Sequence, residues 1–223
     1  MIVLGLEGAL GGFSAAVARD GEIVAAHALD GNVALEAGLG VLARLMRDAR
    51  VEPPQLDRLA VGVGPGSFTG LRITIAYAKS LAQAWDRPLV AISSFDALEC
   101  GQALPHVLTV VLGRAGVISA RYRAPGQSAR ASGRTAEVLR EVLLGTQPGD
   151  LPVVGAPEDV LCALAEGGWT VSARAPLVTP PAAAVALLGA STPAATSAHA
   201  VRADYGELPA AKVPRFDPTP RTR

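Results

Sequence analysis

A glycine-rich segment at residues 61–72 carries the most specific combination of residue types in this sequence. It reads VGVGPGSFTGLR and lies between an apolar run typical of a strand and a segment typical of a helix. Glycine permits a backbone of positive φ and close approach of other atoms, and a helix N-terminus presents unpaired N–H groups. The junction therefore suits either an anion or a tightly packed neighbouring chain.

Three general loop motifs do not match this segment. A Walker phosphate loop needs four residues between its glycines and then a lysine, whereas five residues separate Gly64 from Gly70 and no lysine follows. The dinucleotide fingerprint needs a third glycine where Thr69 stands. A nucleophile elbow needs glycines on both sides of Ser67, where Pro65 and Thr69 stand. We therefore interpret Ser67 as the N-cap of the following helix, a position that serine favours.

Composition excludes other kinds of site. The sequence has 20 basic and 20 acidic residues, so we do not expect a broad basic field that binds nucleic acid directly. Cys100 and Cys162 are isolated, which predicts neither a disulfide framework nor a zinc site. The histidines share no ligand spacing, and we predict no metal site; they are His27, His106 and His199.

The N-terminus lacks a basic region before its apolar run, and no stretch of about 18 uninterrupted apolar residues occurs. We expect a soluble, cytoplasmic protein without a membrane anchor.

Hydrophobic periodicity indicates an α/β order in the first hundred residues. The predicted elements are strands at 2–6, 13–18 and 22–28, a helix that carries the apolar stripe at 35–46 and stops near Pro53-Pro54, a strand at 59–63, a helix at 71–85 and a strand at 89–92. The pair Asp20-Gly21 predicts a hairpin turn.

The second half begins in a similar way, with apolar runs at 107–112 and 117–123, and then the similarity decays. A helix at 135–144, a strand at 151–154 and a helix at 181–190 are predicted there. We predict a first lobe at 1–100, a smaller, degenerate second lobe at 101–213 and a flexible tail at 214–223.

Two helical stripes are candidates for a partner interface. They consist of Leu35, Leu39, Leu42 and Met46 on the first helix, and Leu71, Ile75, Ala78 and Ala82 on the second. Each helix also needs an apolar face against its own sheet, so interior packing is the alternative for these residues. The second helix is apolar on a further side, through Ile73, Tyr77 and Leu81, and two apolar faces indicate two packing partners.

The glycine-rich segment closely resembles the signature of the bacterial TsaB (YeaZ) family. The matching residues are Gly64, Pro65, Gly66, Ser67, Phe68, Thr69, Gly70, Leu71, Arg72 and Ile73. A looser similarity extends over residues 1–100. The resemblance implies an α/β fold of the actin-like ATPase type (ASKHA, ribonuclease-H-like) with two lobes. It also implies that the loop from Gly64 to Gly70, with Arg72, has a structural or interface role and contacts an anion if it binds a ligand.

In function, the resemblance implies a non-catalytic subunit that the paralogous TsaD requires. TsaD transfers a threonylcarbamoyl group to the adenosine next to the anticodon, position 37, of tRNAs reading ANN codons. TsaE joins through the complex, a homodimer forms when the chain is alone, and no cofactor is expected. The stripe-bearing helices would pair with their counterparts on TsaD or on a second copy. Transfer RNA is an indirect partner, and direct contact by Arg121, Arg123, Arg130 and Arg134 stays open.

Two departures from the family pattern put a nucleotide site in doubt. Glu7 ends the first predicted strand where the family commonly has Asp, and Gly113 stands where it often has a carboxylate. We interpret Glu7 as a structural or solvated carboxylate, with a metal-facing relic as the alternative. An actin-like ATPase, a kinase, a peptidase or a homodimeric scaffold outside tRNA modification remain the alternative functions.

Overall fold

The computed structural model describes residues 1–29, 34–114 and 116–206, and for residues 34–36 the backbone alone. The first sheet has the order β3-β2-β1-β4-β5. Two hairpins join β1, β2 and β3, whereas β1, β4 and β5 run parallel. The predicted turn between β2 and β3 is confirmed, with φ of 52° at Asp20 and 85° at Gly21. The strands are Ile2–Glu7 (β1), Phe13–Arg19 (β2), Glu22–Leu29 (β3), Arg58–Gly64 (β4) and Leu89–Ser93 (β5).

The second sheet repeats this topology in the order β10-β9-β6-β7-β8. The prediction that the similarity between the two halves decays after the first hairpin is wrong for the order of the strands. The sequence did not predict β8 and β10. Both are edge strands with few buried residues, so they lack the apolar pattern of a strand. The strands are Val107–Leu112 (β6), Val117–Ala124 (β7), Gln127–Arg134 (β8), Asp150–Val154 (β9) and Thr170–Arg174 (β10).

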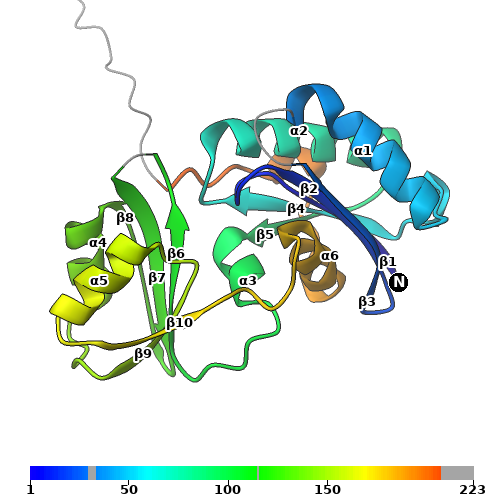
Figure 1. The fold of residues 1–223 in the computed structure, drawn as a ribbon. Coiled ribbons are helices and arrows are strands. Elements are labelled where there is room, and N and C mark those ends of the chain that lie inside the picture. Colours follow the sequence, from blue (N-terminus) through cyan, green and yellow to red (C-terminus); the bar gives the residue numbers. More distant parts are fainter. Residues whose placement is uncertain (30–33, 115, 207–223) are drawn as a thin grey trace, which may run out of the picture.

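Helices cover both faces of the first sheet (Figure 1). α1 and α2 lie on one face and α6 on the other, while α4 and α5 cover the second sheet. The α-helices are Ala34–Asp48 (α1), Phe68–Ala84 (α2), Ser94–Glu99 (α3), Thr135–Val142 (α4), Glu158–Glu166 (α5) and Pro181–Ser191 (α6). Single 3-10 turns occur at Pro53–Gln55 (η1) and Ala198–Ala200 (η2). In the described part of the chain, no helix combines the length and apolar character needed to cross a bilayer.

The chain returns to the first lobe after the second sheet. α6 packs so closely on β1 that a Cβ built on Gly5 would lie 2.5 Å from the Ala182 carbonyl oxygen. The alanines of α6 permit this approach, since they present only a methyl group to the sheet. Residues 181–191, which the sequence assigned to a second lobe at 101–213, therefore belong to the core of the first. Residues 214–223, predicted as a tail, lie outside the described residues.

Candidate functional site

The signature loop, Gly64 to Gly70, is held against the turn that follows β1. Gly64 and Gly66 have φ of 100° and 150°, which favour glycine, and the Gly64-Pro65 peptide bond is cis. A Cβ on Gly66 would lie 2.4 Å from the Ala9 carbonyl oxygen. That oxygen also accepts a hydrogen bond of 2.9 Å from the Ser67 N–H. The loop thus has a structural role: it joins two turns of the first lobe.

Ser67 is the N-cap of α2, as the sequence predicted. Its hydroxyl oxygen accepts a hydrogen bond of 3.3 Å from the Gly70 N–H. α2 begins at Phe68, earlier than the predicted start at Leu71, because the cap precedes the first apolar stripe residue. Among the other signature side chains, Pro65 is buried, whereas Phe68, Thr69 and Arg72 are exposed.

Glu7 is buried at the end of β1, with 1% of its surface exposed. One carboxylate oxygen accepts a 2.7 Å hydrogen bond from the Ala9 N–H, and the other accepts a 3.0 Å bond from the Leu10 N–H. Burial raises the pKa of Glu7 to about 7, although these backbone hydrogen bonds lower it. Both oxygens therefore hold the turn after β1, which gives this carboxylate a structural role.

A cleft of about 920 Å³ lies between the lobes. It is lined by the segments that follow β1, β4 and β9, by the end of β6, and by single residues of α3 and the C-terminal segment. Open α/β sheets place ligand crevices at the carboxyl ends of their strands in the same way. Here the walls are mainly apolar, formed by side chains such as Leu10, Leu98, Val110 and Val111.

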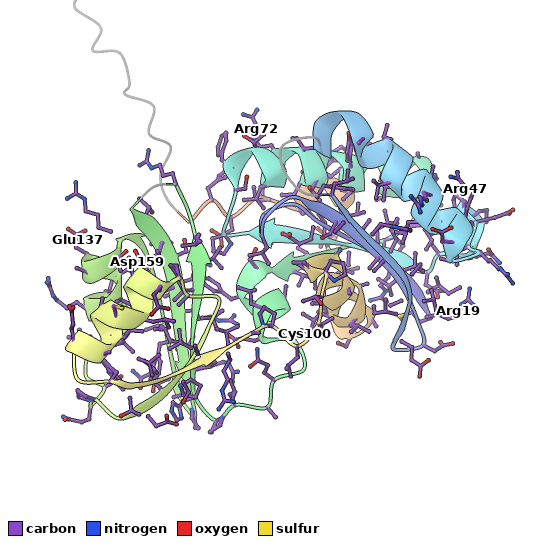
Figure 2. The ribbon with its side chains drawn as sticks, in the orientation of Figure 1. Arg19, Arg47, Arg72, Cys100, Glu137 and Asp159 are labelled. Atoms are coloured by element: carbon purple, nitrogen blue, oxygen red, sulfur yellow. The ribbon has the colours of Figure 1, made fainter. Side chains whose placement is uncertain are left out.

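A partly exposed pair of aromatic rings, Phe68 and Tyr205, lies at the rim of this cleft. Phe68 is half exposed, and the centroids of the Phe68 and Tyr205 rings are 4.8 Å apart. The Arg72 guanidinium lies 5.3 Å from the centroid of the Phe68 ring. Figure 2 shows Arg72 pointing away from α2. We call Phe68, Arg72 and Tyr205 the rim cluster. Sequence reasoning missed Tyr205, because no local pattern indicates that the C-terminal segment returns to the signature loop.

The model of one protein family, tRNA N6-adenosine threonylcarbamoyltransferase (TsaD), matches residues 35–198. The chain belongs to this family. Within it the chain is TsaB-like: 54 residues are 43% identical to the tRNA threonylcarbamoyladenosine biosynthesis protein TsaB of Bacillus subtilis. A further 113-residue match is 35% identical to a tRNA N6-adenosine threonylcarbamoyltransferase of Nitratidesulfovibrio vulgaris.

The two matches cover 24% and 44% of this chain, and 24% and 31% of the relatives. The chain thus spans about a quarter to a third of the length of these curated relatives. The solved structure of YeaZ from Pseudomonas aeruginosa superimposes with a TM-score of 0.68 at 20% identity. That likeness covers 92% of this chain and 99% of the other, and it concerns the fold. The predicted two-lobed α/β actin-like ATPase fold is confirmed.

For this TsaB-like chain, the structure places most of the predicted interface stripe in its own core. The buried members are Leu42, Leu71, Ile75, Ala78 and Ala82. Met46 is partly buried against the same core, and Leu39 is 57% exposed. The side chain of Leu35 lies outside the described residues. The alternative prediction, that these residues pack in the interior, therefore holds for the five buried residues. They lie against the first sheet and are not available to a partner.

His27 and His106 make side-chain contacts in different lobes. His27 Nε2 is 2.8 Å from a carboxylate oxygen of Asp48, and His106 Nε2 is 2.8 Å from the carbonyl oxygen of Asp150. Over residues 1–29, 34–114 and 116–206, no group of three or more His, Cys, Asp or Glu could hold a metal ion.

Three of the four arginines left open as tRNA contacts form internal ion pairs. Arg121 and Arg123 bind Glu99, and Arg130 binds Asp204. Their guanidinium groups are thus already engaged within the chain. Arg134, the N-cap of α4, is exposed.

Proposed function

We propose that this chain is the non-catalytic subunit that TsaD requires to transfer threonylcarbamoyl to adenosine 37 of tRNAs reading ANN codons. The TsaD-family match and the similarity to TsaB support a role in threonylcarbamoyladenosine biosynthesis. On this proposal TsaD is the direct partner, TsaE joins through the complex, and the chain contacts tRNA indirectly. The reaction takes place in the cytoplasm, where the substrate tRNA is.

The observation that carries the proposal is the environment of Glu7. A carboxylate at the end of the first strand orders metal and water beneath the phosphates in actin-like ATPases. Here both Glu7 oxygens accept backbone N–H groups of the next turn, and the side chain is buried. Such a carboxylate holds the chain together and is not presented to the cleft. We therefore propose that the subunit acts without a nucleotide of its own.

The proposed partner surface is the solvent face of α1 and α2 together with the rim cluster. The two helices meet where Gly38 faces Tyr77, and a Cβ on Gly38 would lie 2.7 Å from the Tyr77 ring. This contact fixes the pair as one platform. Leu39 is exposed on it, and Gly40 faces open space. A matching helix pair on TsaD, or on a second copy when the chain is alone, would complete a four-helix bundle.

Reconstitution tests the proposal. Purified TsaD of the same organism is assayed with TsaE, ATP, threonine, bicarbonate, the enzyme that makes the adenylate and unmodified tRNA, with and without this chain. We expect modified adenosine only when the chain is present, and a one-to-one complex with TsaD by light scattering. Equal modification without the chain would overturn the proposal. ATP or peptide hydrolysis by the chain alone, lost in Glu7→Gln, would favour the enzyme alternatives instead.

A further inference from the structure

α3 joins the two lobes. It follows β5 of the first sheet and lies between the two sheets (Figure 1). Ala97 packs in a cluster with residues of the first lobe, whereas Phe95 and Leu98 pack on the second sheet. Phe95 and Leu98 form one buried cluster with Val107 and Val111 of β6 and Val154 of β9. The lobes therefore share a small core at this helix.

Charged groups surround this core and pair across the lobes. Glu99, 8% exposed, lies with Oε1 2.9 Å from Arg121 Nη2 and Oε2 3.0 Å from Arg123 Nη2. The Thr109 hydroxyl donates to Oε1 as well. Asp96, one turn earlier on α3, lies 2.7 Å from Arg121 Nη1. Both carboxylates of α3 are thus bound by arginines of β7.

A second tie runs from the other side. The guanidinium groups of Arg121 and Arg130 lie 5.1 Å and 5.2 Å from the centroid of the same Phe95 ring. Arg130 also pairs with Asp204 in the C-terminal segment. The Asp204 N–H donates a 2.7 Å hydrogen bond to the Val63 carbonyl oxygen, at the end of β4. This tie therefore connects β8 of the second sheet to β4 of the first.

These contacts favour one geometry. A nearly buried carboxylate that has lost one arginine would keep part of its charge uncompensated, so sliding or opening of the lobes is costly. The two sets of contacts are centred on Glu99 and on Asp204. Leu98, next to Glu99 in sequence, and Tyr205, next to Asp204, both line the cleft. Both sets of contacts therefore lie next to residues that line the cleft.

We propose that Glu99 and Arg121 form the centre of an ionic joint that holds the two lobes at one fixed opening. The joint comprises Asp96, Glu99, Arg121 and Arg123, with Arg130 and Asp204 as its outer tie. Its consequence for binding rests on the proposed function: TsaD docks on a preorganised arrangement of the rim cluster and pays no cost for ordering the lobes.

Electron–electron distance measurement tests the joint. Spin labels are placed on the native Cys162 of α5 and on Gln83→Cys of α2, both exposed, in a Cys100→Ser chain. We expect one narrow distance distribution. Arg121→Met should widen it at least about twofold, because Arg121 contacts both α3 carboxylates and only the contact of Arg123 with Glu99 remains.

The matched control is Arg44→Met, which makes the same chemical change at an exposed pair within α1, Arg44 with Asp48. It should leave the distribution unchanged. If Arg121→Met does not fold, Arg123→Met and Asp204→Asn test the joint at more exposed positions. A broad distribution in the starting chain, or unchanged widths in all folded joint variants, would overturn the proposal.

Binding to TsaD tests the consequence separately. If the docking arrangement falls to about a tenth of the molecules, the apparent affinity falls about tenfold. We expect that loss for Arg121→Met. Arg140→Met, at an exposed arginine of α4 on the second lobe and outside the proposed partner surface, is the control for binding and should show no loss. Absence of a complex with the unsubstituted chain would count against the proposed function, whereas the distance distributions would still decide the joint.

Discussion

Gly8 and Gly70 touch so closely that neither position has room for a side chain. A Cβ on Gly70 would lie 1.7 Å from the Gly8 carbonyl oxygen, and a Cβ on Gly8 would lie 2.1 Å from Thr74 Oγ1. The contact presses the turn after β1 onto the first turn of α2. The backbone of the signature loop therefore depends on this pair of glycines.

Gly70→Ala should lower the free energy of unfolding by about 2 kcal/mol. The new methyl group meets backbone rather than a flexible side chain, so the turn or the helix has to move, and this outweighs the gain in helix propensity. Urea denaturation measures the effect. Gly40→Ala is the matched control, because Gly40 also lies within a helix but faces open space. It should raise stability by up to about 1 kcal/mol, and equal effects of the two variants would contradict the close contact.

Ser67→Ala should destabilise the chain by about 1 kcal/mol through loss of the N-cap hydrogen bond to the Gly70 N–H. Ser80→Ala, at an exposed position within the same helix, serves as the control and should change stability by less than about 0.5 kcal/mol. Thermal and urea unfolding measure both. A Ser67→Ala chain as stable as the control would show that the hydroxyl does not cap α2.

Stability should fall as the pH rises through the titration of Glu7. Burial raises its pKa from 4.5 to about 7, so the folded chain holds a proton that the unfolded chain releases. The contribution of this group is full below pH 4.5, declines up to about pH 7 and is constant above it. The whole change amounts to about 3 kcal/mol.

Urea titrations from about pH 5 to about pH 8 measure how the free energy of unfolding changes with pH in the wild type and in Glu7→Gln, whose side chain cannot ionise. The difference in unfolding free energy between the two chains should shift with pH in favour of the variant. Glu22→Gln, an exposed glutamate at the start of β3, should keep the wild-type slope. Parallel curves for wild type and Glu7→Gln would refute the assignment.

Local patterns predicted the elements whose signal lies within a few residues. The hairpin at Asp20-Gly21, the cap at Ser67 and the helix predicted at 181–190, which the structure has at Pro181–Ser191, follow from turn chemistry, capping and composition. The polar edge strands β8 and β10 gave no such signal, because their residues do not alternate between apolar and polar as they do in a strand with one buried face.

The site depends on contacts between residues far apart in sequence, and these the sequence could not provide. Tyr205 reaches Phe68, and Glu99 reaches Arg121, only because the topology returns the C-terminal segment to β4 and places α3 on the second sheet. Periodicity found the apolar stripe of α2 but not its direction. A stripe that faces a sheet and one that faces a partner have the same spacing, and burial alone distinguishes them.

Leu39→Glu should weaken the complex with TsaD by at least about tenfold, or about 1.4 kcal/mol. Leu39 is 57% exposed on the proposed platform, so a partner that buries it would have to bury the new carboxylate without a counter-charge. Leu144→Glu makes the same change at a 76% exposed leucine after α4, on the second lobe, and should bind normally. Titration calorimetry gives both affinities, and thermal melts establish that both chains fold. If the two variants bound equally well, the partner surface would lie elsewhere than on α1 and α2.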